Sequence, residues 1–198
     1  MISRSNRSAR RVTLGAAAFE GAIGLAGLAL ASRLERPAWD QLQGRPWDVG
    51  VGLLAAVPLV AGFWMAMRRP LGPLRELREL TRRVVAALFR DCAAYELLLI
   101  AVMAGLGEEL FFRGFLQQWL IERAGVWVGL AVASLAFGAL HLLSITYAAL
   151  ATLVGAFLGW LCLASGNLVA AITAHAVYDF IALWWLVRQI GADSDERP

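Results

Sequence analysis

Long runs of apolar residues alternate with short polar segments along the chain, and the runs have the length of membrane spans. About 20 helical residues cross a hydrocarbon core of roughly 30 Å. Six runs meet this condition, at positions 12–32, 49–67, 93–121, 126–143, 147–164 and 168–187. The pattern predicts an all-α fold, a polytopic membrane helix bundle of about six transmembrane helices, with residues 1–198 as a single integral membrane domain.

A shorter amphipathic segment lies between the second and third runs. In 71–90, leucine, valine and alanine recur at helical spacing among Arg75, Arg78, Arg82 and Arg83. This pattern is typical of an amphipathic helix on the membrane surface, and a solvated charged loop is the alternative.

The first run, 12–32, also has features of a secretory signal. Arg10 and Arg11 precede it, and it ends with an Ala-Leu-Ala sequence of the kind that precedes a signal-peptidase site. The run is long for a signal segment and contains Glu20, so we interpret it as a retained helix.

Composition supports a membrane environment. Apolar residues make up 60% of the chain and charged residues 17%, and the mean hydropathy is +0.64. The basic residues crowd at the N-terminus and between Arg68 and Arg90, which indicates topology and contact with anionic lipid and argues against nucleic-acid binding. The two cysteines, Cys92 and Cys162, do not indicate a disulfide framework or a metal-binding pair.

Arginines are unequally shared between the two sides of the predicted bundle. All 18 basic residues are arginines, and thirteen of them fall on the side that carries both termini. The positive-inside rule then places both termini in the cytoplasm, which requires an even number of spans.

The third run contains three charged residues where a helix that only packs would have leucines. A charge at the centre of a membrane helix costs about 2.5 to 3.5 kcal/mol, so such residues face a polar interior and find partners. Glu109 and Arg113 are four residues apart and can pair directly, whereas Glu108 points about 100° away around the helix. An ion pair that steadies the bundle is one interpretation. Two glutamates exceed the need of one arginine, which leaves a carboxylate for acid or base chemistry.

This third run is also long for a single straight span. A helix over 93–121 would measure about 43 Å, so we expect a tilt or a kink, with Gly105 and Gly107 as candidate positions.

The chain has two histidines, and both lie in apolar runs. Asp179 follows His175 by four residues, within hydrogen-bonding reach on the same helical face, which would fix the orientation of the imidazole. His141 lies toward the end of the fourth run. Because three separate spans contribute ionisable groups, we expect Glu108 and the two histidines to form one shared polar site.

Three ordered motifs within about 93–187 resemble the CAAX-protease and bacteriocin-processing (CPBP, or Abi) intramembrane peptidases, which include the type II CAAX prenyl endopeptidase. The family's E-E-x-x-x-R matches Glu108, Glu109 and Arg113. Its F-x-x-x-H matches Phe137 and His141, and its H-x-x-x-N/D matches His175 and Asp179.

The resemblance implies hydrolysis of a peptide bond in a membrane-associated protein or peptide. Glu108 would be the general base on a water that His141 helps to hold, and His175 with residue 179 would stabilise the oxyanion. Glu109 and Arg113 would brace the site, with binding of a substrate carboxylate as an alternative role for Arg113. The expected location is a bacterial inner membrane.

Position 179 departs from the prenyl-protease branch, which has asparagine there. An ionised aspartate has only acceptor lone pairs and cannot donate to an oxyanion. Either Asp179 is protonated, or it holds His175 as the donor, and we favour the second because it resembles the orienting half of a hydrolytic triad.

Glu108, His141 and His175 would also suffice as ligands of a catalytic zinc. The helical zinc signature H-E-x-x-H is absent from the sequence, so we favour a glutamate-activated water with no cofactor and keep zinc as the alternative. Two other functions stay open, a transporter or proton-relay protein and a non-catalytic immunity or assembly factor that retains the fold.

Overall fold

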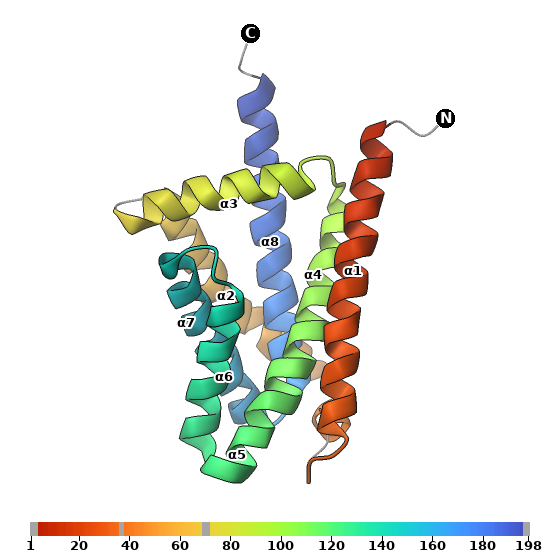
Figure 1. Ribbon diagram of the computed structural model, residues 1–198, viewed down its shortest axis with the longest axis vertical. Coiled ribbons are helices and arrows are strands. Elements are labelled where there is room, and N and C mark those ends of the chain that lie inside the picture. The colour runs from red at the N-terminus through yellow and green to blue at the C-terminus, as the bar shows by residue number, and fades with distance from the viewer. Residues whose placement is uncertain (1–3, 36–37, 69–71, 196–198) are drawn as a thin grey trace.

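The computed structural model describes residues 4–35, 38–68 and 72–195, and these residues form helices and turns without a strand. Most helices run along a common direction, and α3 lies across one end of the bundle (Figure 1). In chain order the elements are α1 (Arg4–Ala31), the short 3₁₀ helix η1 (Ala38–Gln41), α2 (Pro46–Arg68), α3 (Pro73–Phe89), α4 (Ala94–Glu109), η2 (Leu110–Gln117), α5 (Gln118–Ala124), α6 (Val126–Leu140), α7 (Ile145–Ser165) and α8 (Leu168–Asp195).

Helices occupy all of the predicted spans. Among the described residues, α1, α2, α7 and α8 are long and apolar enough to cross a membrane, and α6 is a shorter apolar helix. The remaining predicted span corresponds to α4, η2 and α5, which follow one another without a break. The predicted all-α membrane helix bundle is therefore confirmed.

This third span departs from regular α-helix in its middle, where η2 is a π-helical segment. The departure begins at Leu110, whereas the two candidate kink positions, Gly105 and Gly107, lie within the helix α4. They permit close packing instead. A Cβ at Gly107 would collide with the backbone carbonyl of Glu20 on α1, and one at Gly105 would lie 3.0 Å from the Ile172 carbonyl oxygen on α8.

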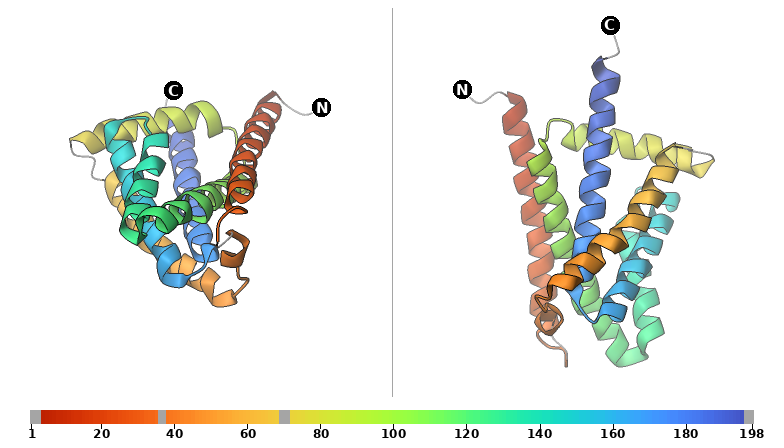
Figure 2. Two further views of the ribbon diagram at one scale, coloured as in Figure 1. Left: turned by 60° about the horizontal axis from the view of Figure 1, so that its bottom comes forward. Right: turned by 180° about the vertical axis from the view of Figure 1, so that it is seen from behind.

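The amphipathic segment is a helix, so the interpretation of 71–90 as a solvated loop is wrong. Leu77 and Val85 on its apolar face are buried, and Val85 packs with Met67 of α2 and Leu186 of α8. An ion pair between Arg82 and Asp193 ties α3 to the part of α8 that extends beyond the bundle. The helix thus covers one end of the bundle, as Figures 1 and 2 show.

Helix α1 begins and helix α8 ends at the end of the bundle that α3 covers (Figure 1, Figure 2). This placement agrees with an even number of spans. The cytoplasmic location of that end stays a prediction from the arginine distribution.

Candidate active site

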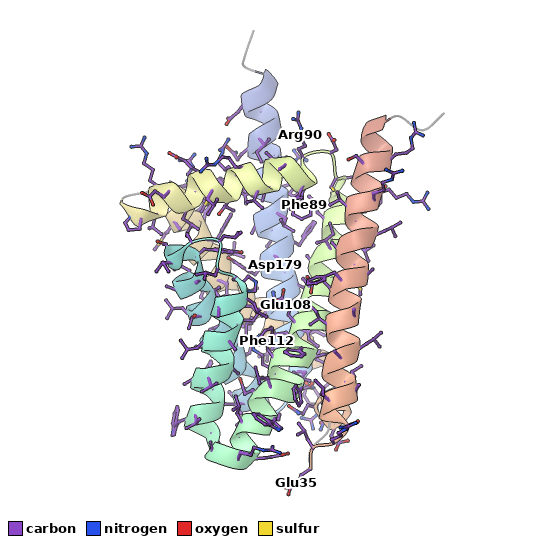
Figure 3. All side chains as sticks on the ribbon, viewed as in Figure 1. Glu35, Phe89, Arg90, Glu108, Phe112 and Asp179 are labelled. Atoms are coloured by element: carbon purple, nitrogen blue, oxygen red, sulfur yellow. The ribbon has the colours of Figure 1, made fainter. Side chains whose placement is uncertain are left out.

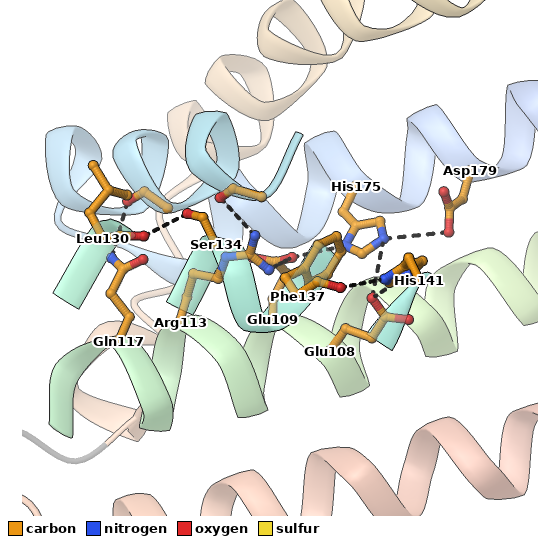
Figure 4. A network of polar contacts seen from close by, with 12 residues as sticks. Glu108, Glu109, Arg113, Gln117, Leu130, Ser134, Phe137, His141, His175 and Asp179 are labelled. Atoms are coloured by element: carbon orange, nitrogen blue, oxygen red, sulfur yellow. Dashed lines mark hydrogen bonds and ion pairs between the residues drawn. The ribbon is translucent and has the colours of Figure 1, made fainter. Parts of the chain in front are cut away.

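Glu108 stands in the last turn of α4, in the interior of the bundle. Figure 3 places it near Asp179, between the end marked by Phe89 and the opposite end marked by Glu35. Its Oε2 atom is 3.9 Å from Nε2 of His141 and 3.9 Å from Nε2 of His175. This oxygen is buried and has no hydrogen-bond partner among the described residues. The carboxylate therefore lies at ion-pair distance from two imidazoles and forms a hydrogen bond with neither (Figure 4).

His141 follows the last residue of α6, and its ring folds back over the preceding helical turn. Its Nδ1 lies 2.8 Å from the carbonyl oxygen of Phe137, and the two rings stack at 4.5 Å between centroids. A carbonyl oxygen only accepts, so Nδ1 carries the hydrogen and donates it. In the neutral imidazole, the lone pair then lies on Nε2, the atom nearest Glu108. The F-x-x-x-H spacing thus fixes the tautomer of His141.

His175 is buried on α8 between two carboxylates. Its Nδ1 lies 2.8 Å from Oε1 of Glu109, and its Nε2 lies 3.4 Å from Oδ2 of Asp179. The sequence spacing pointed to Asp179 as the residue that orients this imidazole. The shorter contact is with Glu109, which stands 66 positions earlier in the chain.

Glu109 also pairs with Arg113, as the spacing of the two residues predicted. Arg113 Nη1 lies 2.7 Å from the same Oε1 atom, and both side chains are almost fully buried. The guanidinium donates from Nη2 to the Gly155 carbonyl oxygen at 2.8 Å, and it lies 4.6 Å from the Phe137 ring centroid. Glu109 therefore connects His175 to Arg113, and Arg113 in turn connects η2 to α7.

A parallel contact one helical turn further on joins the same elements. Gln117 on η2 donates from Nε2 to the Gly159 carbonyl oxygen on α7 at 3.2 Å. Two donors spaced by four residues thus meet two glycine carbonyls spaced by four residues. A Cβ at Gly155 would lie 3.4 Å from Nη2 of Arg113, and one at Gly159 would collide with the side-chain amide of Gln117, so the absence of side chains lets η2 and α7 approach this closely.

An apolar cavity of about 520 Å³ extends from this cluster toward α3. His141, His175 and Asp179 line it together with two tyrosines, Tyr147 and Tyr178, and many apolar side chains of α2, α3, α7 and α8. Sequence reasoning missed both tyrosines. The available signal was scarcity, since the chain has only three tyrosines and one of these lies within the His-Ala-Val-Tyr-Asp segment.

Glu20 is a further acidic residue near the cluster, which sequence reasoning used only as an argument against a signal segment. It interacts electrostatically with His175, Asp179 and Glu108, and its Oε2 is buried without a hydrogen-bond partner among the described residues. Its neighbours on the same face of α1, Gly24 and Gly27, lie against Gly107 and Phe111. Helix α1 thus brings a carboxyl group close to the site.

The described residues contain no group of three or more histidine, cysteine, aspartate or glutamate side chains arranged to hold a metal ion.

Carboxylates and histidines gather at the inner end of an apolar cavity, inside a bundle of membrane helices. Residues 91–181 match the family model described as type II CAAX prenyl endopeptidase Rce1-like. This match supports the resemblance to the CAAX-protease (CPBP) intramembrane peptidases that the three motifs indicated. No curated protein and no solved structure matched the chain.

The matched segment begins just before α4 and ends within α8. It includes all six predicted site residues, Glu108, Glu109, Arg113, His141, His175 and Asp179. It leaves out α1, α2 and α3, so Glu20 and the covering helix are features outside the matched core. A CAAX protease family implies a membrane-associated protein as the substrate.

Proposed function

We propose that this chain hydrolyses a peptide bond of a membrane-associated protein or peptide with a water molecule that Glu108 activates. The observation that carries the proposal is the buried Oε2 of Glu108, which has no partner among the described residues and faces Nε2 of His141 and of His175. A buried carboxylate oxygen normally has a hydrogen-bond donor. A water molecule is the donor that the reaction requires.

The spacing between Glu108 and His141 suits a bridging water. Hydrogen bonds of about 2.8 Å to each atom would span the 3.9 Å separation at an angle of about 90° at the water oxygen. Because Oε2 and the unprotonated Nε2 both accept, such a water would direct one hydrogen to each. Its lone pairs would then be free to attack a carbonyl carbon.

The reaction follows from this arrangement. The water oxygen bonds to the carbonyl carbon while Glu108 takes one water proton, and the carbonyl electron pair moves onto its oxygen. When this tetrahedral oxyanion collapses, the C–N bond breaks and Glu108 delivers the proton to the leaving amine nitrogen. Glu108 thus acts first as a base and then as an acid, which is a common contribution to peptide hydrolysis.

His175 is suited to stabilise the oxyanion in this scheme. Its Nδ1–H is occupied by Glu109 at 2.8 Å, so it donates to the oxyanion from Nε2 when that nitrogen also carries a hydrogen. Arg113 braces Glu109 and does not reach the substrate, because its guanidinium is held by Glu109 and the Gly155 carbonyl and is only 1% exposed.

The same distances fit a tetrahedral zinc less well than a water. Two ligands at 2.0 to 2.1 Å from such a zinc lie about 3.3 to 3.4 Å apart. Glu108 Oε2 is 3.9 Å from the Nε2 atoms of both histidines. We therefore propose a mechanism without a metal. Activity that persists after strong chelation, with no zinc in elemental analysis, is the expected result.

The test compares membrane peptides from cells that contain the wild type or Glu108→Gln. The substitution keeps size and hydrogen bonding but removes the base, so cleavage products present with the wild type should be lost. Purified Glu108→Gln, reconstituted with the substrate found in this way, should be slower by at least about 100-fold. Normal cleavage by this variant would refute the mechanism. Glu108-dependent solute flux without any cleavage product would instead identify a transporter.

A further inference from the structure

Asp179 accepts hydrogen bonds at a position where an oxyanion needs a hydrogen-bond donor. Asp179 is an aspartate at the position that resembles the family's N/D residue, and an ionised carboxylate only accepts hydrogen bonds. Its Oδ2 also lies 3.4 Å from Nε2 of His175, so it competes with the oxyanion for that donor. An oxyanion needs donors held in place before the reaction begins.

Most other donors near the cluster are already engaged. Nδ1 of His141 donates to the Phe137 carbonyl, and Arg113 donates to Glu109 and to the Gly155 carbonyl. Besides the two histidines and Asp179, the polar side chains lining the cavity are Thr81, Tyr147 and Tyr178. Thr81 belongs to α3, which covers the end of the bundle, so the tyrosine hydroxyls are the candidate donors.

Of the two tyrosines, Tyr147 is the one that packs against a histidine facing Glu108. It lies in the first turn of α7, where its backbone N–H donates to the Oγ of Ser144 at 3.1 Å. Its ring packs edge-on against His141 with 5.9 Å between centroids. It interacts electrostatically with both Asp179 and Glu108. Tyr178 also interacts electrostatically with Asp179, but its ring packs against Phe63 of α2 and not against either histidine.

We infer that Tyr147 is a catalytic residue whose hydroxyl donates a hydrogen bond to the tetrahedral oxyanion, supplying the donor that Asp179 lacks. The phenol keeps its proton throughout, because it stabilises charge on the carbonyl oxygen and transfers nothing. A tyrosine hydroxyl is both a donor and compact enough to share a cavity wall with an imidazole. This role depends on the proposed function, since it requires a peptide carbonyl beside Glu108.

The kinetic test removes the hydroxyl and then restores a donor elsewhere. Tyr147→Phe should lower kcat by about 100-fold with KM changed less than about twofold, as loss of one oxyanion donor does. Asp179→Asn places amide hydrogens beside the same oxygen, so in the Tyr147→Phe background it should recover at least about tenfold of the lost kcat. Tyr95→Phe is the matched control, because Tyr95 is an exposed tyrosine at the start of α4.

A binding test separates this inference from the proposed function. The probe is an apolar peptide phosphinate, whose tetrahedral oxyanion mimics the intermediate and needs no turnover. Its Kd should rise at least about tenfold in Tyr147→Phe, even if the wild type cleaves nothing. That combination would overturn the peptidase function but retain the oxyanion donor.

Three results would overturn the assignment of Tyr147. They are an unchanged kcat in an active Tyr147→Phe variant, a double variant no faster than Tyr147→Phe alone, and equal phosphinate affinity in the wild type and Tyr147→Phe. A loss of kcat in Tyr178→Phe without one in Tyr147→Phe would assign the donor to Tyr178 and refute the inference as stated.

Discussion

Replacing Arg113 with methionine would leave the carboxylate of Glu109 buried without its cation. Removing one partner of a buried ion pair costs about 3 to 5 kcal/mol. We expect the lower end, about 3 kcal/mol, because His175 still contacts Glu109 from 2.8 Å. Loss of the hydrogen bond to the Gly155 carbonyl adds about 1 kcal/mol. Arg113→Met should therefore lower the free energy of unfolding by about 4 kcal/mol.

Equilibrium unfolding of the reconstituted protein measures this loss, with two comparison variants. Arg123→Met is the control, because Arg123 is an exposed arginine on α5 that contacts the Trp119 carbonyl and ring, and it should cost less than about 1 kcal/mol. The double variant Arg113→Met with Glu109→Gln removes the unpaired charge and should recover about half of the loss. A single variant as stable as the control, or a double variant no more stable than the single one, would refute the reasoning.

Three further predictions concern packing, an unpartnered carboxyl group and thiol reactivity. Gly159→Ala should destabilise the protein by about 1 to 3 kcal/mol in unfolding measurements, because the new Cβ would lie 2.7 Å from the Leu130 side chain and closer still to Gln117. Gly15→Ala is the control. A Cβ at Gly15 has nothing within 4 Å, so this variant should be neutral or stabilising. Glu20→Leu should raise the thermal midpoint, because it removes a buried oxygen without a partner, and a lower midpoint would show that the carboxyl group is satisfied. Burial raises the pKa of the Cys92 thiol, so at neutral pH maleimide should label Cys92 more slowly than a cysteine placed at exposed Asp91. The difference between the two labelling rates should narrow as pH rises. Equal labelling rates at neutral pH would refute this prediction.

The positions of the helices were predictable because hydropathy reports burial in a bilayer directly. Their ends were less so. The predicted sixth span ends at position 187, because the residues after it are polar, whereas α8 continues to Asp195. An ion pair between Arg82 and Asp193 holds these last turns against α3. A hydropathy pattern contains no information about such a contact between distant segments.

The candidate site was predictable where a single helix brings its residues together. Glu109 and Arg113 pair as their spacing requires. The contact between Glu109 and His175 was not predictable, because it joins two helices, and the side chains at the start of η2 turn by a different angle per residue than in a regular α-helix. Tyr147 was missed for the same reason, since its proximity to His141 depends on the turn between α6 and α7.

The two adjacent glutamates differ in their partners, and this difference explains why the chain has both. Glu109 is fully buried, and its Oε1 contacts both Arg113 and His175, so it is held in one position. The Oε2 atoms of both glutamates lack a hydrogen-bond partner among the described residues. Glu108 differs in being 14% exposed and in having no oxygen that is held as Oε1 of Glu109 is. Because neighbouring residues on a helix point about 100° apart, Glu109 is held between Arg113 and His175, whereas Glu108 lies 3.9 Å from Nε2 of both histidines. A held carboxylate cannot exchange protons freely without losing its partners, whereas an unpartnered one can. This difference is the reason for which we propose Glu108 as the reactive residue and Glu109 as its support.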